Sequence, residues 1–147
     1  AYEIASCLVG SEMCIRDRVL VDETIIGVPY GDADDFESKY GVVFDTVTKQ
    51  SRPFDIEIGY GGKYRFKCGI AYKGRAIFLP SGTPGLPIIS VATDGTFHAT
   101  KTDNSKLFVR PIIFKEKLYT LVFNTIDNSH SLVTIDEWLR INEVIKI

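Results

Sequence analysis

The chain has 147 residues, and its 17 basic and 19 acidic side chains give a formal net charge of -2 at neutral pH. This balance gives no support to nucleic-acid binding, which requires a basic domain or stripe. No apolar run is long enough to cross a bilayer as a helix. Ile, Val, Phe, Tyr and Thr are abundant while long helical periodicity is scarce, so the composition predicts an all-β protein.

The N-terminal eighteen residues stand apart from the rest. Residues 7–17 read Cys-Leu-Val-Gly-Ser-Glu-Met-Cys-Ile-Arg-Asp. This run resembles the translation of a transposase-type sequencing-library adapter, and Arg18 fits the codon that the adapter's last two bases begin. Residues 1–4 resemble the flow-cell primer in the same reading frame. We therefore expect residues 1–18 to be a non-native, adapter-derived segment and exclude them from reasoning on the fold.

Without that segment, 15 basic and 16 acidic residues remain in 129 positions, together with a single cysteine, Cys68. One cysteine allows no disulfide within the chain, and Cys68 is expected to be a small buried apolar residue. Because the natural N-terminus is expected to be missing, the sequence does not indicate the protein's localisation.

Residues 19–147 contain three copies of one unit. Residues 26–31 (Ile-Gly-Val-Pro-Tyr-Gly) align with residues 77–82 (Ile-Phe-Leu-Pro-Ser-Gly), and residues 73–79 (Lys-Gly-Arg-Ala-Ile-Phe-Leu) align with residues 115–121 (Lys-Glu-Lys-Leu-Tyr-Thr-Leu). Each copy has a polar turn, an apolar strand, a loop and a second apolar strand. The second apolar strands are expected at residues 42–44, 88–91 and 132–135. Residues 19–21 fit the end of a strand that precedes the first polar turn.

The middle copy is the clearest. Its strands are predicted at residues 69–72, 76–80, 88–93 and 97–101, separated by a tight turn at 73–75, a loop at 81–87 and the hairpin signal Asp94-Gly95. Four antiparallel strands in a repeat of about 40–50 residues are the signature of a propeller blade. The pattern of residues 69–80, Gly-Ile-Ala-Tyr-Lys-Gly-Arg-Ala-Ile-Phe-Leu-Pro, resembles blades of kelch-like and galactose-oxidase-like β-propellers.

The resemblance implies an incomplete propeller of about three blades, at residues 19–66, 67–107 and 108–147. The remaining blades are then expected in the intact chain. A β-sandwich is the alternative, because short strands at regular spacing also suit that fold.

The third copy poses two questions. Its first strand is expected at residues 110–114, where Pro111 lacks a hydrogen-bond donor and should lie at the strand start or on an edge. Further on, residues 134–137 have the form of a capping box, and a helix from there would place Trp138, Ile141 and Ile145 on one face. The repeat instead expects a strand in this place, and we favour the strand.

In a propeller, the loops after the second strand of each copy and the links between copies share one face. This face collects acidic and polar residues, whereas the hairpin turns on the other face are mixed to basic. Clustered carboxylates raise one another's pKa and attract cations. Alternate carboxylates at Asp32 and Asp34 suggest calcium, but the glycine and spaced glutamate of an EF-hand are absent. A solvated acidic loop is therefore preferred, and neither a metal nor a cofactor is assigned.

Other residues on this face are candidates for contact with a ligand. Tyr60 lies between glycines, and no nucleophile elbow accompanies His130. His98 is expected to be a surface or interface residue. The candidate ligand-binding residues are Asp32, Asp34, Asp35, Tyr60, Asp127 and His130.

Two functions are compatible with this reading, and the fold alone does not choose between them. The first is a binding or interaction module that presents the loop face to a protein or carbohydrate. The second is an enzyme with its site in the central channel of the complete propeller. Inward carboxylates, histidines or tyrosines from successive blades would favour the enzyme. The apolar and small residues expected there favour the binding module.

Overall fold

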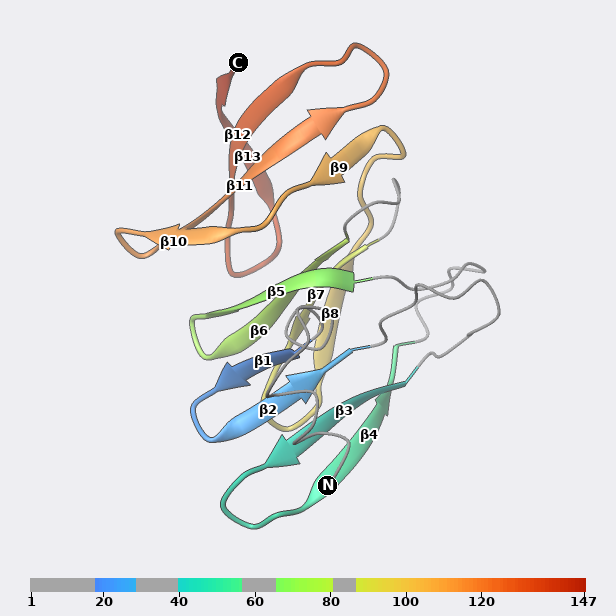
Figure 1. Ribbon diagram of the computed structural model, residues 1–147, viewed down its shortest axis with the longest axis vertical. Helices are drawn as coiled ribbons and strands as arrows, with labels where there is room; N and C mark the ends of the chain where they lie inside the picture. Colours follow the sequence, from blue (N-terminus) through green and yellow to red (C-terminus); the bar gives the residue numbers. More distant parts are fainter. Residues whose placement is uncertain (1–17, 29–39, 57–65, 81–86) are drawn as a thin grey trace, which may run out of the picture.

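The computed structural model describes residues 18–28, 40–56, 66–80 and 87–147. Within these ranges the chain forms thirteen strands and no helix, so the prediction of an all-β fold is confirmed. Accordingly, these ranges contain no helix with the length and apolarity to span a membrane. The strands form three open antiparallel sheets (Figure 1).

Each sheet is built from consecutive strands, and the sheets are named A, B and C in chain order. Sheet A comprises β1 (Arg18–Val21), β2 (Thr24–Gly27), β3 (Tyr40–Asp45) and β4 (Ser51–Asp55). Sheet B comprises β5 (Phe66–Tyr72), β6 (Arg75–Pro80), β7 (Ile88–Val91) and β8 (Phe97–Thr100). Sheet C comprises β10 (Ile112–Phe114), β11 (Lys117–Asn124), β12 (His130–Ile135) and β13 (Ile141–Lys146), with β9 (Lys106–Phe108) also paired to β11.

The middle sheet has the strand order expected from the sequence. Its strands pair as a meander, β5-β6-β7-β8, and every pairing is antiparallel. The turn between β5 and β6 uses Lys73 and Gly74, both with positive φ (48° and 74°), which suits a tight hairpin. The Asp94-Gly95 signal also forms a turn, in which the Gly95 N–H donates to the carbonyl of Ala92 at 3.0 Å. The local turn chemistry thus produces the predicted meander.

The first strand of sheet C is interrupted. Both β9 and β10 pair with β11, and the buried Pro111 lies in the break just before β10. The expected strand at residues 110–114 is therefore shorter, and Pro111 lies just before it, where the missing N–H is tolerated.

The end of the chain forms a strand, so the helix alternative from residue 134 is wrong. Asp136 accepts hydrogen bonds from the backbone N–H groups of Trp138 (3.0 Å) and Arg140 (2.9 Å), which closes a turn between β12 and β13. Leu139 has a φ of 62° in this turn, and its side chain is buried in the hydrophobic core. The turn therefore stops the backbone from continuing as a helix.

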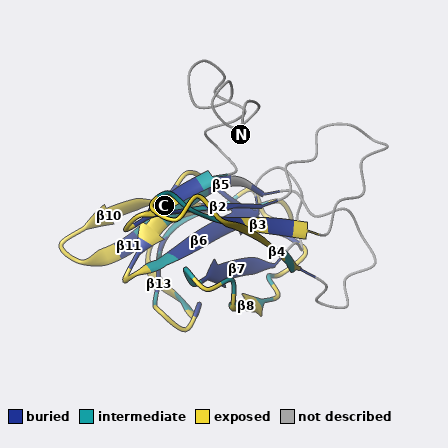
Figure 2. Cartoon of the chain, turned by 90° about the horizontal axis from the view of Figure 1, so that it is seen from below, coloured by how far each residue is buried: buried dark blue, intermediate teal, exposed yellow. Residues whose placement is uncertain are grey.

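The three sheets stack face to face, with sheet B in the middle (Figure 1). Alternate side chains of β6 enter two separate cores: Phe78 packs with sheet A, whereas Ile77 and Leu79 pack with sheet C. Figure 2 shows β6 and β7 as the buried centre, with exposed residues concentrated in β10, β13 and β8. A strand covered on both faces needs apolar residues at successive positions, which explains the continuous apolar run of β6.

Sheets A and B approach each other closely at Gly69. A Cβ atom at this position would lie 2.6 Å from Val19 Cγ2 and 2.7 Å from Phe78 Cδ1. Gly69 thereby leaves the space that the Val19 and Phe78 side chains occupy. The close contact between sheets A and B therefore requires glycine at position 69 as well as apolar side chains around it.

Candidate functional site

The strands β2, β6 and β11 run in the same direction across the stack, so the loops that follow them start on the same side of the molecule (Figure 1). We call this side the loop end, and define it by the C-terminal ends of these three strands. Of the candidate residues, Asp32, Asp34, Asp35 and Tyr60 lie outside the described residues. Asp127 and His130 lie in and beside the described loop between β11 and β12.

The structure separates Asp127 from His130. His130 is the first residue of β12 and pairs with Phe123, and the two rings lie 4.9 Å apart. In the register of sheet C, these rings lie on the face turned away from sheet B, whereas Val122 and Ser131 face the other way. Asp127 belongs to a pocket on that other side. The two candidates therefore do not form one site.

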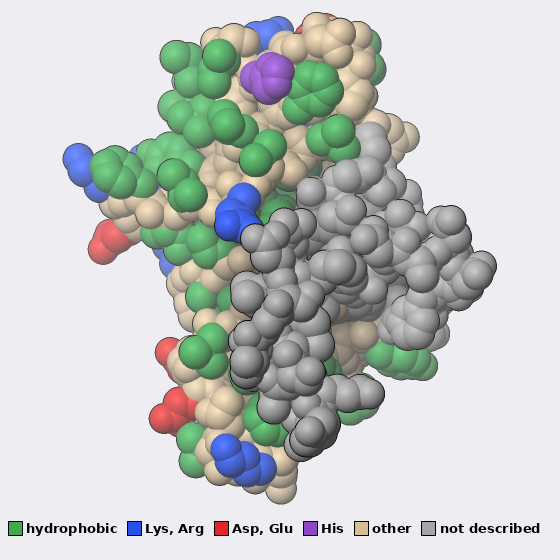
Figure 3. Space-filling model, viewed as in Figure 1, with side chains coloured by type: hydrophobic (Ala, Val, Ile, Leu, Met, Phe, Trp, Pro, Cys, Tyr) green, Lys and Arg blue, Asp and Glu red, His purple; other side chains and the backbone are tan. Residues whose placement is uncertain are grey.

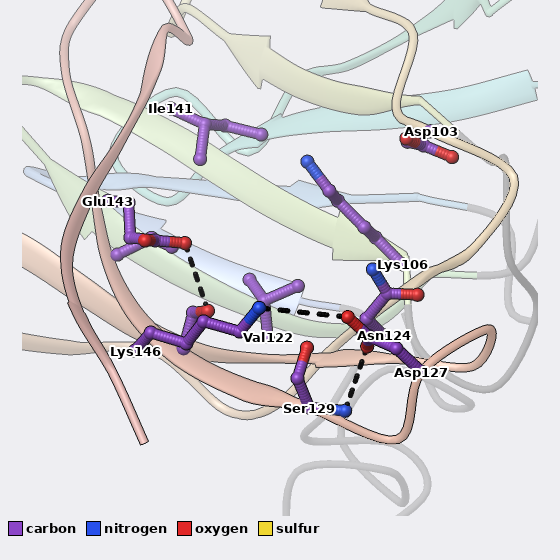
Figure 4. Close-up of a pocket in the computed structure, with 11 residues that line it drawn as sticks. Asp103, Lys106, Val122, Asn124, Asp127, Ser129, Ile141, Glu143 and Lys146 are labelled. Carbon is purple, nitrogen blue, oxygen red and sulfur yellow. Dashed lines mark hydrogen bonds and ion pairs between the residues drawn. The ribbon is translucent and has the colours of Figure 1, made fainter.

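The pocket around Asp127 has a volume of about 410 Å³ and lies at the loop end, on the face of sheet C that turns toward sheet B (Figure 4). Val122, Val133 and Ile141 supply its apolar part, while charged and amide side chains supply the rest. The lining residues are Asp103, Lys106, Val122, Asn124, Asp127, Ser129, Ser131, Val133, Ile141, Glu143 and Lys146.

Two copies of the tripeptide Asp-Asn-Ser, at residues 103–105 and 127–129, hold acidic groups in the lining of the pocket. Asp103 Oδ1 accepts hydrogen bonds from the N–H (3.0 Å) and the hydroxyl (2.8 Å) of Ser105. Asp127 Oδ1 accepts one from the N–H of Ser129 at 2.9 Å. The two turns are joined, because Thr125 N–H donates to the Ser105 carbonyl at 2.8 Å. The repeated tripeptide is a sequence signal that was missed.

These hydrogen bonds favour the ionised form of both aspartates. The N–H and hydroxyl of Ser105, with a contribution from Lys106, lower the pKa of Asp103. The hydroxyl and N–H of Ser129, with a contribution from Lys146, lower the pKa of Asp127. The expectation that clustered carboxylates raise one another's pKa is thus wrong at these two residues. Donated hydrogen bonds stabilise the ionised form and outweigh desolvation, which raises the pKa.

Lysines from other strands balance the acidic groups. Lys146 Nζ lies 3.7 Å from Asp127 Oδ2, and Ser131 Oγ donates to Glu143 Oε2 at 3.1 Å (Figure 4). With Lys106, the pocket presents three carboxylates and two ammonium groups. Among the described residues, no group of three or more His, Cys, Asp or Glu side chains could hold a metal ion.

The sequence did not identify Lys106, Glu143 or Lys146 as pocket residues. Glu143 and Lys146 reach the same face only because the register of β13 against β12 shifts between Leu132 and Val133. In a regular strand, residues three apart point to opposite faces. The β-bulge therefore creates this part of the pocket. No pattern of residue types in the sequence predicts the bulge.

A second groove lies at the opposite end of the strands, beside the hairpin turns. Trp138 is 67% exposed there, and the Arg140 guanidinium lies 5.1 Å from the centre of its ring. Lys73 Nζ lies 3.8 Å from Glu137 Oε1 at the same groove, which His98 of β8 also lines. His98 is exposed, as expected for a surface residue. Cys68 is buried, as expected, with Sγ 3.8 Å from the carbonyl oxygen of Leu79.

No protein-family model matches the chain, and no curated protein sequence matches it. The function must therefore be inferred from the fold and from the geometry of the loop end.

Proposed function

We propose that the chain is a three-blade segment of a β-propeller that serves as an interaction module, with the pocket at the loop end as the binding site for a protein segment. The blade interpretation is supported by three sheets of consecutive antiparallel strands that stack face to face. In a sandwich, two sheets pack together and Greek-key connections carry the chain between them. Here each sheet is completed before the next begins, as in propeller blades.

The proposed function rests mainly on one observation: residues from two separate connections between strands line the same pocket. Asp103 belongs to the link that leads from sheet B into sheet C, and Asp127 belongs to the loop between β11 and β12. Loops presented by a rigid scaffold are common positions for binding residues. The joined Asp-Asn-Ser turns give this pair of loops a defined shape.

A protein ligand is favoured by the combination of an apolar anchor with paired charges. Ile126, between Asn124 and Asp127, is 81% exposed. Protein interfaces combine such apolar side chains with a polar rim, and the carboxylates and ammonium groups of the pocket would supply that rim.

An enzymatic site in a central channel has less support. The strands that would line the channel are the first of each sheet, namely β1, β5, β9 and β10. Within these described strands there is no histidine and no carboxylate. Tyr72 is present, but its hydroxyl donates to the carbonyl of Glu116. General acid–base chemistry usually employs a histidine or a carboxylate, so the interaction module is preferred.

The proposal is tested by selecting binding peptides from a displayed library and measuring their affinity calorimetrically. The variants Lys146→Ala, Ile126→Ala and Asp127→Asn should weaken binding, since each removes a charge or the anchor. Asn at position 127 keeps the Oδ1 acceptor of the turn. The control Val47→Ala changes an exposed apolar residue in the turn between β3 and β4, distant from the pocket.

Equal affinity of the selected peptides for the wild type and all three variants would contradict the proposed site. Saturable binding of an oligosaccharide that those variants abolish, in the absence of peptide binding, would assign a carbohydrate ligand instead.

A further inference from the structure

Sheet C carries an apolar face that none of the described strands covers. The strand register places one set of side chains on the face turned away from sheet B. They belong to the pairs Ile112↔Tyr119 and Phe114↔Lys117 and to the ladder Leu121↔Leu132↔Ile145. Ile112, Phe114 and Ile145 are 60%, 58% and 56% exposed. Figure 3 shows hydrophobic side chains gathered over this end of the molecule. Large exposed apolar patches mark interaction sites.

The internal repeat shows what kind of surface this is. Ile26 of β2, Ile77 of β6 and Tyr119 of β11 occupy the same place in the three copies. Ile26 packs into the core against sheet B, and Ile77 packs into the core against sheet C. The face of sheet C with Tyr119 therefore corresponds to the face with which each preceding sheet contacts the next one.

The first strands give the same correspondence. Val21, Tyr72 and Phe114 are the last residues before the polar turn in sheets A, B and C. Val21 is buried against sheet B and Tyr72 against sheet C, whereas Phe114 is exposed. Two independent positions thus indicate that the open face of sheet C is built to receive another sheet.

Sheet A presents the complementary kind of face. Leu20 is 60% exposed, and its pairing with Ile25, followed by Ile25↔Phe44, places the three side chains on the side turned away from sheet B. By the same repeat, Ile25 corresponds to Ala76, which packs against sheet A, and to Leu118, which packs against sheet B. The open face of sheet A therefore corresponds to the face that receives a preceding sheet.

We infer that the open face of sheet C binds the open face of sheet A of a second copy of this chain. This inference rests on the blade interpretation in the proposed function, but not on the ligand pocket. Two copies related by a two-fold axis form this contact twice. Each copy contributes three sheets, so the dimer closes a ring of six sheets. Six lies within the usual range of about four to eight blades, and closure covers both apolar faces.

Light scattering coupled to size exclusion, performed on the full chain, should give twice the 16.4 kDa mass of one chain. Leu121→Asp and Leu20→Asp should each give monomers, since a carboxylate would be buried in both contacts. Val47→Asp is the matched control, because Val47 is an exposed apolar residue in a turn outside both faces. This control should remain dimeric, and circular dichroism should show that all variants retain strand structure.

Mixing the two monomeric variants provides the sharpest measurement. One partner then contributes an intact sheet A face and the other an intact sheet C face, so a mixed dimer should form through one undamaged contact. A monomeric wild type, or an assembly larger than a dimer, would overturn the inference. So would a dimer that Leu121→Asp dissociates and Leu20→Asp leaves intact, because that result indicates contact between two C faces. Peptide binding by a monomeric wild type would leave the proposed ligand pocket standing while the dimer failed.

Discussion

The hydroxyl of Tyr72 in sheet B donates a hydrogen bond to the backbone carbonyl of Glu116, 3.2 Å away in the turn between β10 and β11. It links two successive sheets at the end of the molecule where the hairpin turns lie. The Tyr72 ring is buried in the core between the same two sheets. One side chain therefore joins sheets B and C by apolar packing and by a directed hydrogen bond.

Replacing Tyr72 by Phe removes the hydrogen bond and keeps the ring. We expect the free energy of unfolding to fall by about 1 kcal/mol, since the Glu116 carbonyl loses its partner. Urea denaturation of the wild type and variant measures this difference. Tyr119→Phe is the control, because the described part of the structure gives the Tyr119 hydroxyl no hydrogen bond. An equal loss of stability in both variants would show that the Tyr72–Glu116 bond contributes nothing specific.

Glu116→Gly is expected to stabilise the protein. Glu116 has a φ of 64°, and the corresponding residue of sheet B is Gly74, with a φ of 74°. Left-handed backbone costs a residue with a side chain roughly 1–2 kcal/mol, while the extra freedom of glycine in the unfolded chain offsets roughly 0.5–1 kcal/mol. The net gain should be about 0.5–1 kcal/mol and should raise the melting temperature in calorimetry.

The matched control is Glu23→Gly in the equivalent turn of sheet A. Glu23 is not one of the described residues with positive φ, so glycine there brings only the entropic cost and should lower the melting temperature. Stabilisation by both substitutions, or by neither, would contradict the role given to backbone conformation.

Stability should decrease in acid. Hydrogen bonds donated in turns lower the pKa values of five aspartates: Asp45, Asp94, Asp103, Asp127 and Asp136. At Asp136, desolvation is the largest single influence and raises the pKa, but the hydrogen bonds from Arg140 and Trp138 together outweigh it. A carboxyl with a lower pKa in the folded state stabilises the fold above its unfolded pKa of about 3.9. That contribution is lost as the pH falls below this value and through the folded pKa.

The urea midpoint, measured between pH 7 and pH 3, should therefore stay level at first and decrease below about pH 4. A variant with Asp103→Asn and Asp127→Asn keeps both Oδ1 acceptors but cannot titrate, and its midpoint should decrease less. A midpoint that rises on acidification would contradict the lowered pKa values.

The adapter interpretation predicts that removal of residues 1–17 leaves the stability nearly unchanged, because a segment of that origin would not have been selected to pack against this fold. The deletion ends before Arg18, which begins β1 and pairs with Gly27. Calorimetry of the shortened and complete chains measures the difference. A loss greater than about 2 kcal/mol, the scale of a severe core substitution, would show that the segment is part of the fold.

Sequence reasoning worked best where the structure depends on neighbouring residues. Asp94-Gly95 and Lys73-Gly74 fixed the turns of the middle meander, because positive φ is a local requirement that few residues satisfy. The strand expected at residues 110–114 included Pro111, whereas β10 begins only after it. Sequence reasoning was less able to choose between helix and strand after residue 134, where the outcome depends on Leu139 packing in a core formed with another sheet.

Residue composition and local patterns were sufficient to predict that the protein is all-β and to predict the strand order and turns of the middle sheet. The tertiary structure decided which side chains meet. His130 and Asp127 are close in sequence but lie on opposite sides of sheet C, because side chains alternate across a strand. Glu143 and Lys146 share a pocket because a β-bulge shifts the register of β13. Turns follow from local backbone preferences, whereas a site assembled from several strands depends on registers that only the packed sheets establish.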